Sequence, residues 1–434
     1  MPGSPQQFRR SLIAIAALFA VLGFQYATWA SRLPALKARL HLNPAQVGVL
    51  LMVCGVGAAA SLPLVTALMR RLGSGRLAMA SGLGLVAVLP ALAAAPDYPV
   101  AIAVLCFDGV AVACFNVAMN AQGSALEAAH GRTAMARLHA TFSGGSFAAA
   151  LLASAVAAMT SRVSTHFAVA CVVILLLLAG ARAGLLSDDR GDPGEWAGEA
   201  ASGSAATEPA PAPKRRLALV SHLTLVSRLT AWMGIAMVFG TVTEGAMNDW
   251  SALYLKDVAR SPAEVVPLGI AVVSAMMVTA RLLADGWRTR FGDARVVATG
   301  SAVAAAGLAS AIAVGGTIPA LAGFACVGAG MAAVTPCIYA AAARQGPTAL
   351  ALVAATGTLG LLLGPALIGF ITDARGPRWG MYTIAAAAAV VTISSARIGW
   401  TAAPAPATSG ARTPHQAGTE PQPAGATVAA PADS

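Results

Sequence analysis

Residues 11–30 have the sequence SLIAIAALFAVLGFQYATWA, which contains no charged side chain. Two further stretches, Val47–Leu68 and Ala298–Val314, are also free of charge. An α-helix needs about 20 mainly apolar residues to cross the hydrocarbon core of a bilayer. Runs of this kind therefore predict membrane-spanning helices.

The composition supports an integral membrane protein. Hydrophobic residues make up 57% and charged residues 11% of the 434 residues, whereas soluble domains have about 25% charged residues. A soluble chain of this length would need far more polar surface to cover its cores. The net charge of +10 comes from short basic clusters between apolar runs, which is typical of membrane flanks and argues against nucleic-acid binding.

The alternation of apolar runs and polar breaks predicts an all-α fold with twelve transmembrane helices. The first run continues to residue 30 without a small-residue cleavage site, so we expect an uncleaved span and not a signal peptide. The spans are expected near residues 11–31, 46–69, 77–95, 100–123, 138–160, 166–186, 226–250, 263–285, 296–314, 318–343, 349–372 and 380–400.

Two segments rich in Gly, Ala, Pro and polar residues, 188–216 and 401–434, are expected to be a disordered cytoplasmic linker and tail. The linker separates an N-terminal six-helix bundle, residues 1–187, from a C-terminal one, residues 217–400. On this topology, 20 of the 28 lysines and arginines lie on the side of both termini. Basic residues concentrate on the cytoplasmic side, so both termini are predicted to be cytoplasmic in a multi-pass protein of the cytoplasmic (inner) membrane.

The two halves of the sequence repeat one another. Asn43–Gln46 (NPAQ) opens the second predicted span and Ser261–Glu264 (SPAE) opens the eighth. Each has the residues of a capping box with proline at the first helical position. Trp29 corresponds to Trp250 at a similar offset. Because six spans separate the copies, they share one orientation and predict a 6+6 parallel pseudo-repeat.

These features resemble the major facilitator superfamily, and within it the bacterial branch near fucose permease, many of whose members have no assigned substrate. The resemblance implies a monomeric transporter in which spans one, four, seven and ten line a central cavity. The matching stretches are Ala27–Pro34 (ATWASRLP), Met119–Gly123 (MNAQG), Glu127, Arg137–His139 (RLH) and Glu244–Trp250 (EGAMNDW).

Polar side chains within these four spans are candidates for substrate binding, because they are costly in a membrane unless they face a partner or water. Several lie four residues apart and share a helix face, and Pro336 can kink span ten. Amides that join helices and tryptophans that anchor at the interface are the alternative interpretations. The candidates are Gln25, Trp29, Asn116, Asn120, Asn248, Thr335 and Tyr339.

Two carboxyl groups, Asp108 and Glu244, fall well inside predicted spans and have no basic residue one helical turn away. Desolvation favours the protonated form of such a group, so both are candidates for coupling transport to protons, with Glu244 preferred. Asp249, Lys256 and Asp257 are expected to be solvated loop charges.

A charged cytoplasmic gate is expected near the inner ends of the helices. The loop after the second span departs from the family pattern G-x-x-x-D-R-x-G-R-R, because Thr66 and Arg70 replace its leading glycine and its aspartate. Ordinary basic flanking is the alternative interpretation. The candidate gating residues are Arg70, Arg71, Arg281, Asp285 and Arg344.

We expect no catalytic group, metal site or cofactor. The six cysteines lie in apolar runs without a C-x-x-C pair, and His130 and His139 lack a metal-ligand spacing. The sequence contains neither the ATP-binding pattern G-x-x-x-x-G-K-[ST] nor H-E-x-x-H. An ATP-driven pump and an intramembrane protease or transferase are therefore not favoured.

The sequence favours a secondary active transporter, not an enzyme, that works by alternating access and is coupled to protons. A small polar, sugar-like solute is the preferred substrate, and the lipid bilayer is the other partner. Efflux of amphipathic compounds is the main alternative. A non-transporting membrane sensor or a membrane-embedded enzyme is less favoured.

Overall fold

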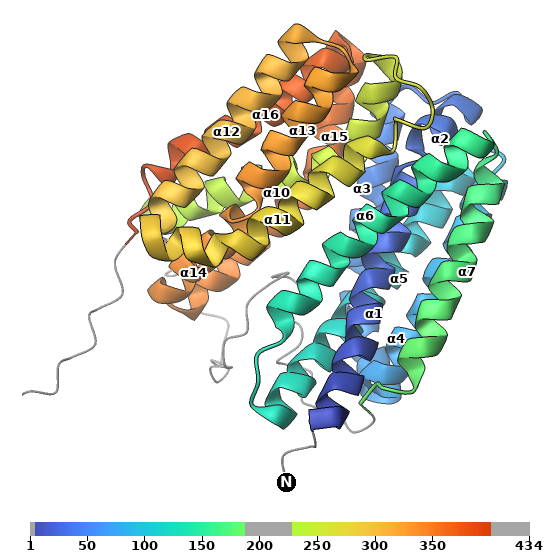
Figure 1. Ribbon diagram of the computed structural model, residues 1–434, viewed down its shortest axis with the longest axis vertical. Coiled ribbons are helices and arrows are strands. Elements are labelled where there is room, and N and C mark those ends of the chain that lie inside the picture. Colours follow the sequence, from blue (N-terminus) through green and yellow to red (C-terminus); the bar gives the residue numbers. More distant parts are fainter. Residues whose placement is uncertain (1–4, 187–227, 401–434) are drawn as a thin grey trace, which may run out of the picture. The chain divides into compact units, whose positions relative to one another are not determined.

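The computed structural model describes residues 5–186 and 228–400 (Figure 1). Within these ranges every regular element is a helix. The expected linker at 188–216 and tail at 401–434 lie outside the described residues. The first group of helices is α1 (Pro5–Ala30), α2 (Leu33–Arg39), α3 (Pro44–Ala60), α4 (Leu62–Ala94), α5 (Tyr98–His130), α6 (Met135–Met159) and α7 (Val163–Arg182). The second is α10 (Arg228–Asp257), α11 (Leu268–Phe291), α12 (Asp293–Val314), α13 (Thr317–Met331), α14 (Val334–Gln345), α15 (Pro347–Arg375) and α16 (Pro377–Ser395).

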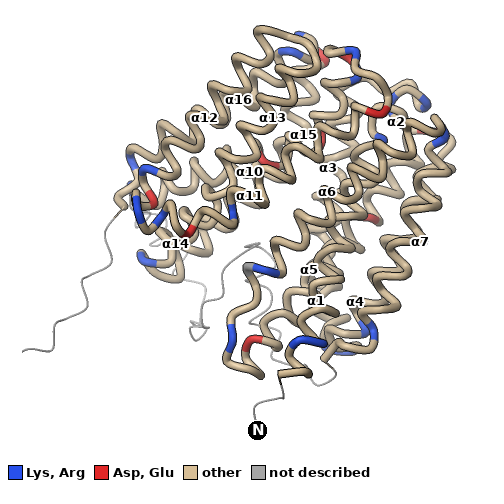
Figure 2. Tube along the Cα trace, viewed as in Figure 1, with Lys and Arg blue, Asp and Glu red and all other residues tan. Residues whose placement is uncertain are grey.

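Nine segments within the described ranges are long and apolar enough to cross a membrane. Eight of them each match one predicted span. The ninth, Leu62–Ala94, contains the end of the predicted second span, which is divided at Ser61, and the predicted third span. Large hydrophobic side chains are exposed along them, such as Leu176 (68%), Leu282 (73%) and Phe370 (55%). Such surfaces suit contact with lipid. Charged residues lie mainly near the helix ends (Figure 2). The all-helical membrane fold is confirmed, and the count of twelve remains a prediction.

Two breaks in the helices match expected span boundaries or kinks. Gly73 interrupts α4 with φ +75°, a conformation that only glycine adopts without strain, and so separates the predicted second and third spans. The predicted tenth span is divided into α13 and α14 just before Pro336, whose missing N–H and ring disfavour an unbroken helix.

The two predicted capping boxes have different outcomes. At α3 the Asn43 side chain accepts from the Gln46 N–H at 2.8 Å, and Gln46 Oε1 accepts from the Asn43 N–H at 2.9 Å. The prediction at Ser261 is wrong: its hydroxyl pairs with that of Thr317 at 2.8 Å, and α11 begins only at Leu268. Contact with a neighbouring helix thus replaces the local cap.

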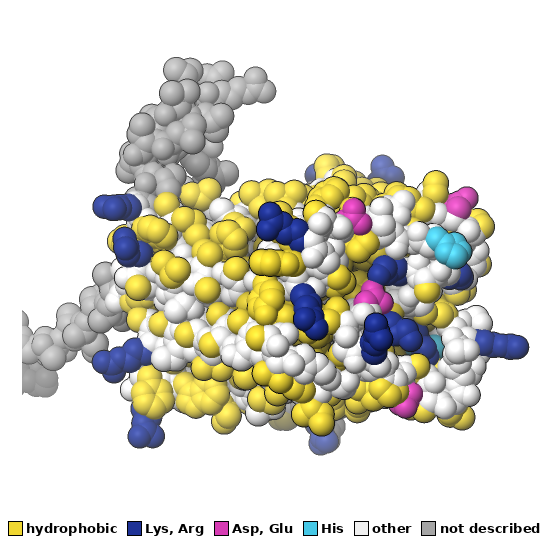
Figure 3. Space-filling view, turned by 90° about the horizontal axis from the view of Figure 1, so that it is seen from above, with side chains coloured by type: hydrophobic (Ala, Val, Ile, Leu, Met, Phe, Trp, Pro, Cys, Tyr) yellow, Lys and Arg dark blue, Asp and Glu magenta, His cyan; other side chains and the backbone are white. Residues whose placement is uncertain are grey.

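The helices before and after the undescribed segment 187–227 are called here the first half, α1–α7, and the second half, α10–α16. Within the first half, α1 packs on α5, α6 and α7, and α3 and α4 pack on α5; within the second, α10 packs on α15 and α16, and α12 on α13 and α16. The halves meet where α3 packs on α15, α6 on α11, and α10 on α1 and α2. The end of the helices where α2 lies is called the α2 end; Figure 3 shows both basic and acidic side chains on this face.

The crossing of α3 and α15 brings the halves into backbone contact. A Cβ atom on Gly369 would lie 2.7 Å from the Pro44 carbonyl oxygen and 2.8 Å from the Gly48 Cα. Small residues at helix crossings let backbones approach closely in membranes. Glycine at both positions is therefore a condition for closure at the α2 end.

We predict that Gly369→Ala lowers the melting temperature of the detergent-solubilised protein, because the added methyl group forces apart backbone that cannot move locally. Overpacking of this kind costs about 1–3 kcal/mol. Gly286→Ala in α11 is the matched control, since its Cβ meets no atom within 4 Å. Equal melting temperatures for the two variants would contradict the proposed crossing.

Candidate functional site

A cavity of 140 Å³ lies where α1, α3, α10 and α15 approach one another. Its wall combines two aromatic rings, one thiol, two hydroxyl groups and one carboxyl group with apolar side chains, and it is lined by both halves. The residues around it include Tyr26, Trp29, Cys54, Thr241, Asp249 and Leu361. Two larger hollows, of 450 and 480 Å³, lie among exposed hydrophobic side chains such as Trp287 and Phe107, which places them on the lipid-facing surface.

Asp108 is held in the interior of the first half and is 1% exposed. Its Oδ1 accepts a hydrogen bond from Gln25 Nε2 at 2.9 Å, and the Cys54 thiol lies 3.7 Å from Oδ2. Both partners are neutral, and no ion pair to Asp108 occurs among the described residues. The predicted candidates Gln25 and Asp108 are thus brought together across α1 and α5.

Asp249 was expected in a solvated loop, and this expectation is wrong. It lies within α10, is 5% exposed, and accepts a hydrogen bond from the hydroxyl of Tyr26 on α1. Sequence reasoning missed both residues. Asp249 falls at the end of the predicted seventh span, where a charged side chain usually faces water, and Tyr26 was not among the polar candidates of the first span. The period that places Asp249 and Ala246 on one helix face could have indicated the cavity.

The two repeated tryptophans are buried, with Trp29 2% and Trp250 4% exposed. The alternative of an interfacial anchor therefore does not describe them in this structure. Trp29 meets Tyr26 edge to face, with ring centroids 5.3 Å apart, and lines the cavity. Within the described part of the chain, neither indole N–H has a hydrogen-bond partner, so both donors are available to another group.

Glu244 has a basic partner that the sequence did not predict. Its Oε1 lies 3.0 Å from Nη2 of Arg281 on α11, and Nη1 of the same guanidinium donates to Ser143 on α6 at 3.1 Å. Arg281 therefore ties the second half to the first. Because a basic group compensates Glu244, its environment differs from that of Asp108.

The remaining amide candidates bond within their own helices. Asn120 Nδ2 donates to the Asn116 carbonyl at 2.9 Å and to its Oδ1 at 3.1 Å, and Asn248 Nδ2 donates to the Glu244 carbonyl at 3.2 Å. They confirm the predicted shared faces, yet none is among the residues that line the cavity. Thr335 and Tyr339 lie in α14, where Tyr339 is 4% exposed.

The expected gating residues are distributed over separate contacts. Arg281 pairs with Glu244, Asp285 lies 3.6 Å from Arg288, and Arg344 lies 3.5 Å from Asp293. Arg70 and Arg71 are exposed. Asp293, which sequence reasoning missed, also accepts from Arg288 Nε at 2.8 Å and so joins α11, α12 and α14.

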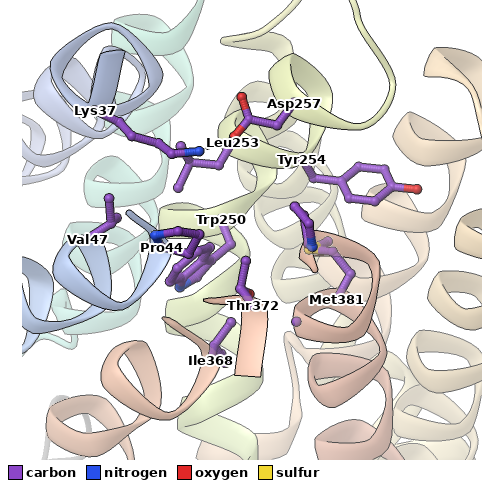
Figure 4. Close-up of a pocket in the computed structure, with 12 residues that line it drawn as sticks. Lys37, Pro44, Val47, Trp250, Leu253, Tyr254, Asp257, Ile368, Thr372 and Met381 are labelled. Carbon is purple, nitrogen blue, oxygen red and sulfur yellow. Dashed lines mark hydrogen bonds and ion pairs between the residues drawn. The ribbon is translucent and has the colours of Figure 1, made fainter. Parts of the chain in front are cut away.

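The α2 end is closed by polar contacts between the halves. Lys37 on α2 lies 2.5 Å from Asp257 on α10, and its ammonium group points toward that carboxylate in Figure 4. Ser154 Oγ on α6 donates to the Glu264 carbonyl at 2.5 Å. Trp250 lies below the Lys37–Asp257 pair (Figure 4). Lys37, Trp250 and Asp257 line a separate small pocket at this end.

The described residues contain no group of three or more His, Cys, Asp or Glu side chains placed to hold a metal ion. His130 and His139 instead pack edge to face against Phe8 and Phe19, with centroids 5.2 and 5.0 Å apart. Glu127, part of the matching motif, accepts from the backbone N–H groups of Ala134 and Met135 at the start of α6. That carboxylate has a structural role as a helix cap.

An all-helical fold with several apolar spans and an internal cavity shared by two halves defines a polytopic membrane transporter. The sequence profile described as Major Facilitator Superfamily matches residues 13–349, and the chain belongs to this family. Two of its relatives are named as transporters of this kind, and it is not an enzyme. The uncharacterized transporter y4wD of Sinorhizobium fredii is 32% identical over 384 residues, which cover 87% of this chain and 96% of the relative.

Solved structures show the same fold at low sequence identity. The nucleoside transporter NupG matches with a TM-score of 0.67 and 14% identity, covering 90% of this chain and 98% of NupG. FucP, a family member solved in the outward conformation, matches with a TM-score of 0.55 and 15% identity, covering 91% of this chain and all of FucP.

The Glu244–Arg281 contact generates a prediction. Glu244→Gln and Arg281→Gln should each lower the melting temperature, because each leaves one charge without its partner. The double variant should lose less unfolding free energy than the sum of the losses in the two single variants. Both side chains are more than a quarter exposed, so we expect a coupling of about 0.5–1 kcal/mol. Asp285→Asn, in a side chain that is 92% exposed, serves as the control with little effect. Strict additivity would contradict an energetic link between the two residues.

Proposed function

We propose that the protein is a proton-coupled secondary transporter that moves a small solute across the cytoplasmic (inner) membrane by alternating access. In this proposal twelve spans form two six-helix bundles, both termini are cytoplasmic, and the working unit is a monomer. The α2 end is then external. Membership of the family and the position of the cavity between the two halves support the proposal.

The observation that carries the proton coupling is the environment of Asp108. An ionised carboxylate that is 1% exposed and has only Gln25 and Cys54 as partners lacks the compensating charge that a buried ion needs. The group can hold a proton in the closed state and release it when the cavity admits water. Glu244 is paired with the basic Arg281 within the second half, whereas Asp108 has no such partner. We therefore propose Asp108 as the main coupling residue, and Glu244 as the group that positions Arg281, whose hydrogen bond to Ser143 on α6 links the halves.

For the substrate we propose a small polar solute. The cavity offers the indole of Trp29, the hydroxyl of Thr241 and the carboxyl of Asp249, which can stack on and hydrogen-bond to a hydroxylated compound. NupG is a nucleoside transporter by its title, and this adds nucleosides to the compounds worth testing. Gln25 is the second candidate near the site, through its contact with Asp108.

A second candidate function is the export of an amphipathic compound. Leu51, Val242 and Leu361 make one part of the cavity wall apolar, and apolar surface with few polar groups is typical of sites for larger hydrophobic ligands. The two functions differ in which chemical class stabilises the protein.

A stability screen of the purified full-length protein tests the proposed function. The panel contains sugars, polyols, nucleosides, amino acids, organic acids and amphipathic cations. A compound that binds only the folded state raises its stability by about 2.7 kcal/mol at a hundredfold excess over Kd. Hits among hydroxylated compounds support the small polar solute, and hits confined to amphipathic cations favour export. If no hit is then transported by proteoliposomes, the proposal of a transporter for these classes fails.

We predict that Asp108→Asn abolishes accumulation of the identified compound driven by an imposed pH gradient, because the neutral amide cannot carry the proton. Exchange of labelled for unlabelled compound at equal pH should persist, since it needs no net proton movement. Both are measured in proteoliposomes. Asp97→Asn, in an exposed residue at the start of α5, is the control acid.

The same assay separates the two carboxyl groups. Glu244→Gln should slow transport yet keep its dependence on the pH gradient, because Glu244 is compensated by Arg281. Loss of gradient-driven accumulation in Glu244→Gln, with its retention in Asp108→Asn, would reverse the assignment.

A further inference from the structure

Two neighbouring residues of α1 hold two buried carboxyl groups that come from different halves. Gln25 donates to Asp108 within the first half, and Tyr26 donates to Asp249 in the second half. Asp249 and Tyr26 both line the 140 Å³ cavity, as does Cys54, which contacts Asp108. One turn of α1 therefore connects the carboxyl groups of the two halves.

We infer that Asp249 is a second proton-carrying group of the transport cycle, and that its hydrogen bond with Tyr26 links its charge to closure of the α2 end. This inference rests on the proposed function and adds a residue from the second half to it. Tyr26 acts in it as a positioning residue.

An ionised carboxylate at Asp249 has a high free energy in the closed arrangement. In this structure the side chain is 5% exposed, and its hydrogen-bond partner is the neutral phenol of Tyr26. No ion pair to Asp249 occurs among the described residues. One neutral hydrogen bond does not offset removal of an ionised carboxylate from water. A proton on Oδ2 of Asp249 removes that cost. Oδ1 then still accepts the hydrogen bond from the Tyr26 hydroxyl.

Tyr26 and Asp249 are on different halves, so their hydrogen bond exists only while α1 and α10 remain in contact. Separation of the halves at the α2 end breaks this bond and exposes Asp249 to water entering the cavity, where the ionised form is no longer costly. The closed state therefore binds the proton more tightly than the open state, and by linkage a rise in pH favours opening.

The other charged and titratable groups around α10 do not replace this role. On α2, Lys37 is paired with Asp257 two turns beyond Asp249, and on α11, Arg281 is paired with Glu244. On α15, the residues that share the cavity wall with Asp249 are not titratable. On α14, Tyr339 is the buried titratable group. On α16, Arg378 and Tyr382 interact electrostatically with Tyr254 of α10, which lies beyond Asp249 toward the end of that helix. Tyr26, Cys54 and Asp108 are the titratable groups that remain near it.

The test measures the distance between the halves at the α2 end in full-length protein in lipid nanodiscs. Spin labels are attached through p-acetylphenylalanine at Ser161, between α6 and α7, and at Ala374, in the last turn of α15; both positions are exposed, and the native cysteines stay in place. Pulsed electron–electron double resonance measures the distribution of distances between the two labels. The short and long distances give the closed and open populations, which are followed from about pH 5 to about pH 9.

In the otherwise unchanged protein, the ratio of closed to open molecules should fall with rising pH, by up to about tenfold per pH unit for each coupled proton. Asp249→Asn and Asp108→Asn should each reduce this slope by one proton, and the double variant should show little dependence on pH. Tyr26→Phe should lower the closed fraction at every pH and keep the slope, because the carboxyl group remains.

Asp257→Asn is the control, because it removes the partly exposed pair with Lys37 at the same end. In this variant the closed fraction should fall and the dependence of the closed-to-open ratio on pH should be retained.

A pH dependence in Asp249→Asn equal to that of the unchanged protein overturns the inference. A closed fraction in Tyr26→Phe equal to that of the unchanged protein also overturns it. If Asp108→Asn alone flattens the profile, the proposed proton coupling stands without Asp249. If the unchanged protein shows no response to pH and Asp108→Asn accumulates the compound normally, the coupling itself fails.

Discussion

Asp108 and Asp249 are buried among packed helices, and neither carboxyl group forms an ion pair with a basic side chain in the described part of the chain. The free energy of such a charge is high in a medium of low polarity, and it falls as soon as water enters. A change of protonation therefore carries enough free energy to decide between a closed and an open arrangement of the helices. The hydrogen bonds from Gln25 and Tyr26 place both groups along one turn of α1.

The contacts between the halves are suited to being broken and remade. Gly48 and Gly369 meet by backbone van der Waals contact, and Lys37 with Asp257 forms a partly exposed pair. Exposed pairs contribute little net stability because water replaces their partners. Neither contact leaves an uncompensated group when the halves separate. Tyr26 and Asp249 differ, since the consequence of breaking their bond depends on whether Asp249 carries a proton.

Local patterns predicted much of the fold. The charge-free run of residues 11–30 became α1, and the Asn43–Gln46 box became the start of α3. The same pattern at Ser261 failed, because the hydroxyl of Thr317 competes for the side chain. For the site, periodicity identified Gln25 and Trp29, and Asp108 was identified as a carboxyl group inside a predicted span without a basic residue one turn away. Asp249 was assigned to a loop because charged residues near a span end usually face water.

The sequence by itself determined that this chain is a helical membrane protein, because apolar length, helix period and basic flanks are properties of each segment alone. Only the tertiary structure decided which polar side chains meet: Gln25 with Asp108, Tyr26 with Asp249, and Glu244 with Arg281. These partners are 37 to 223 residues apart along the chain. Helix crossing sets which of them come into contact, and no local pattern encodes it; yet the partner, neutral or basic, decides whether a buried carboxyl group keeps its charge.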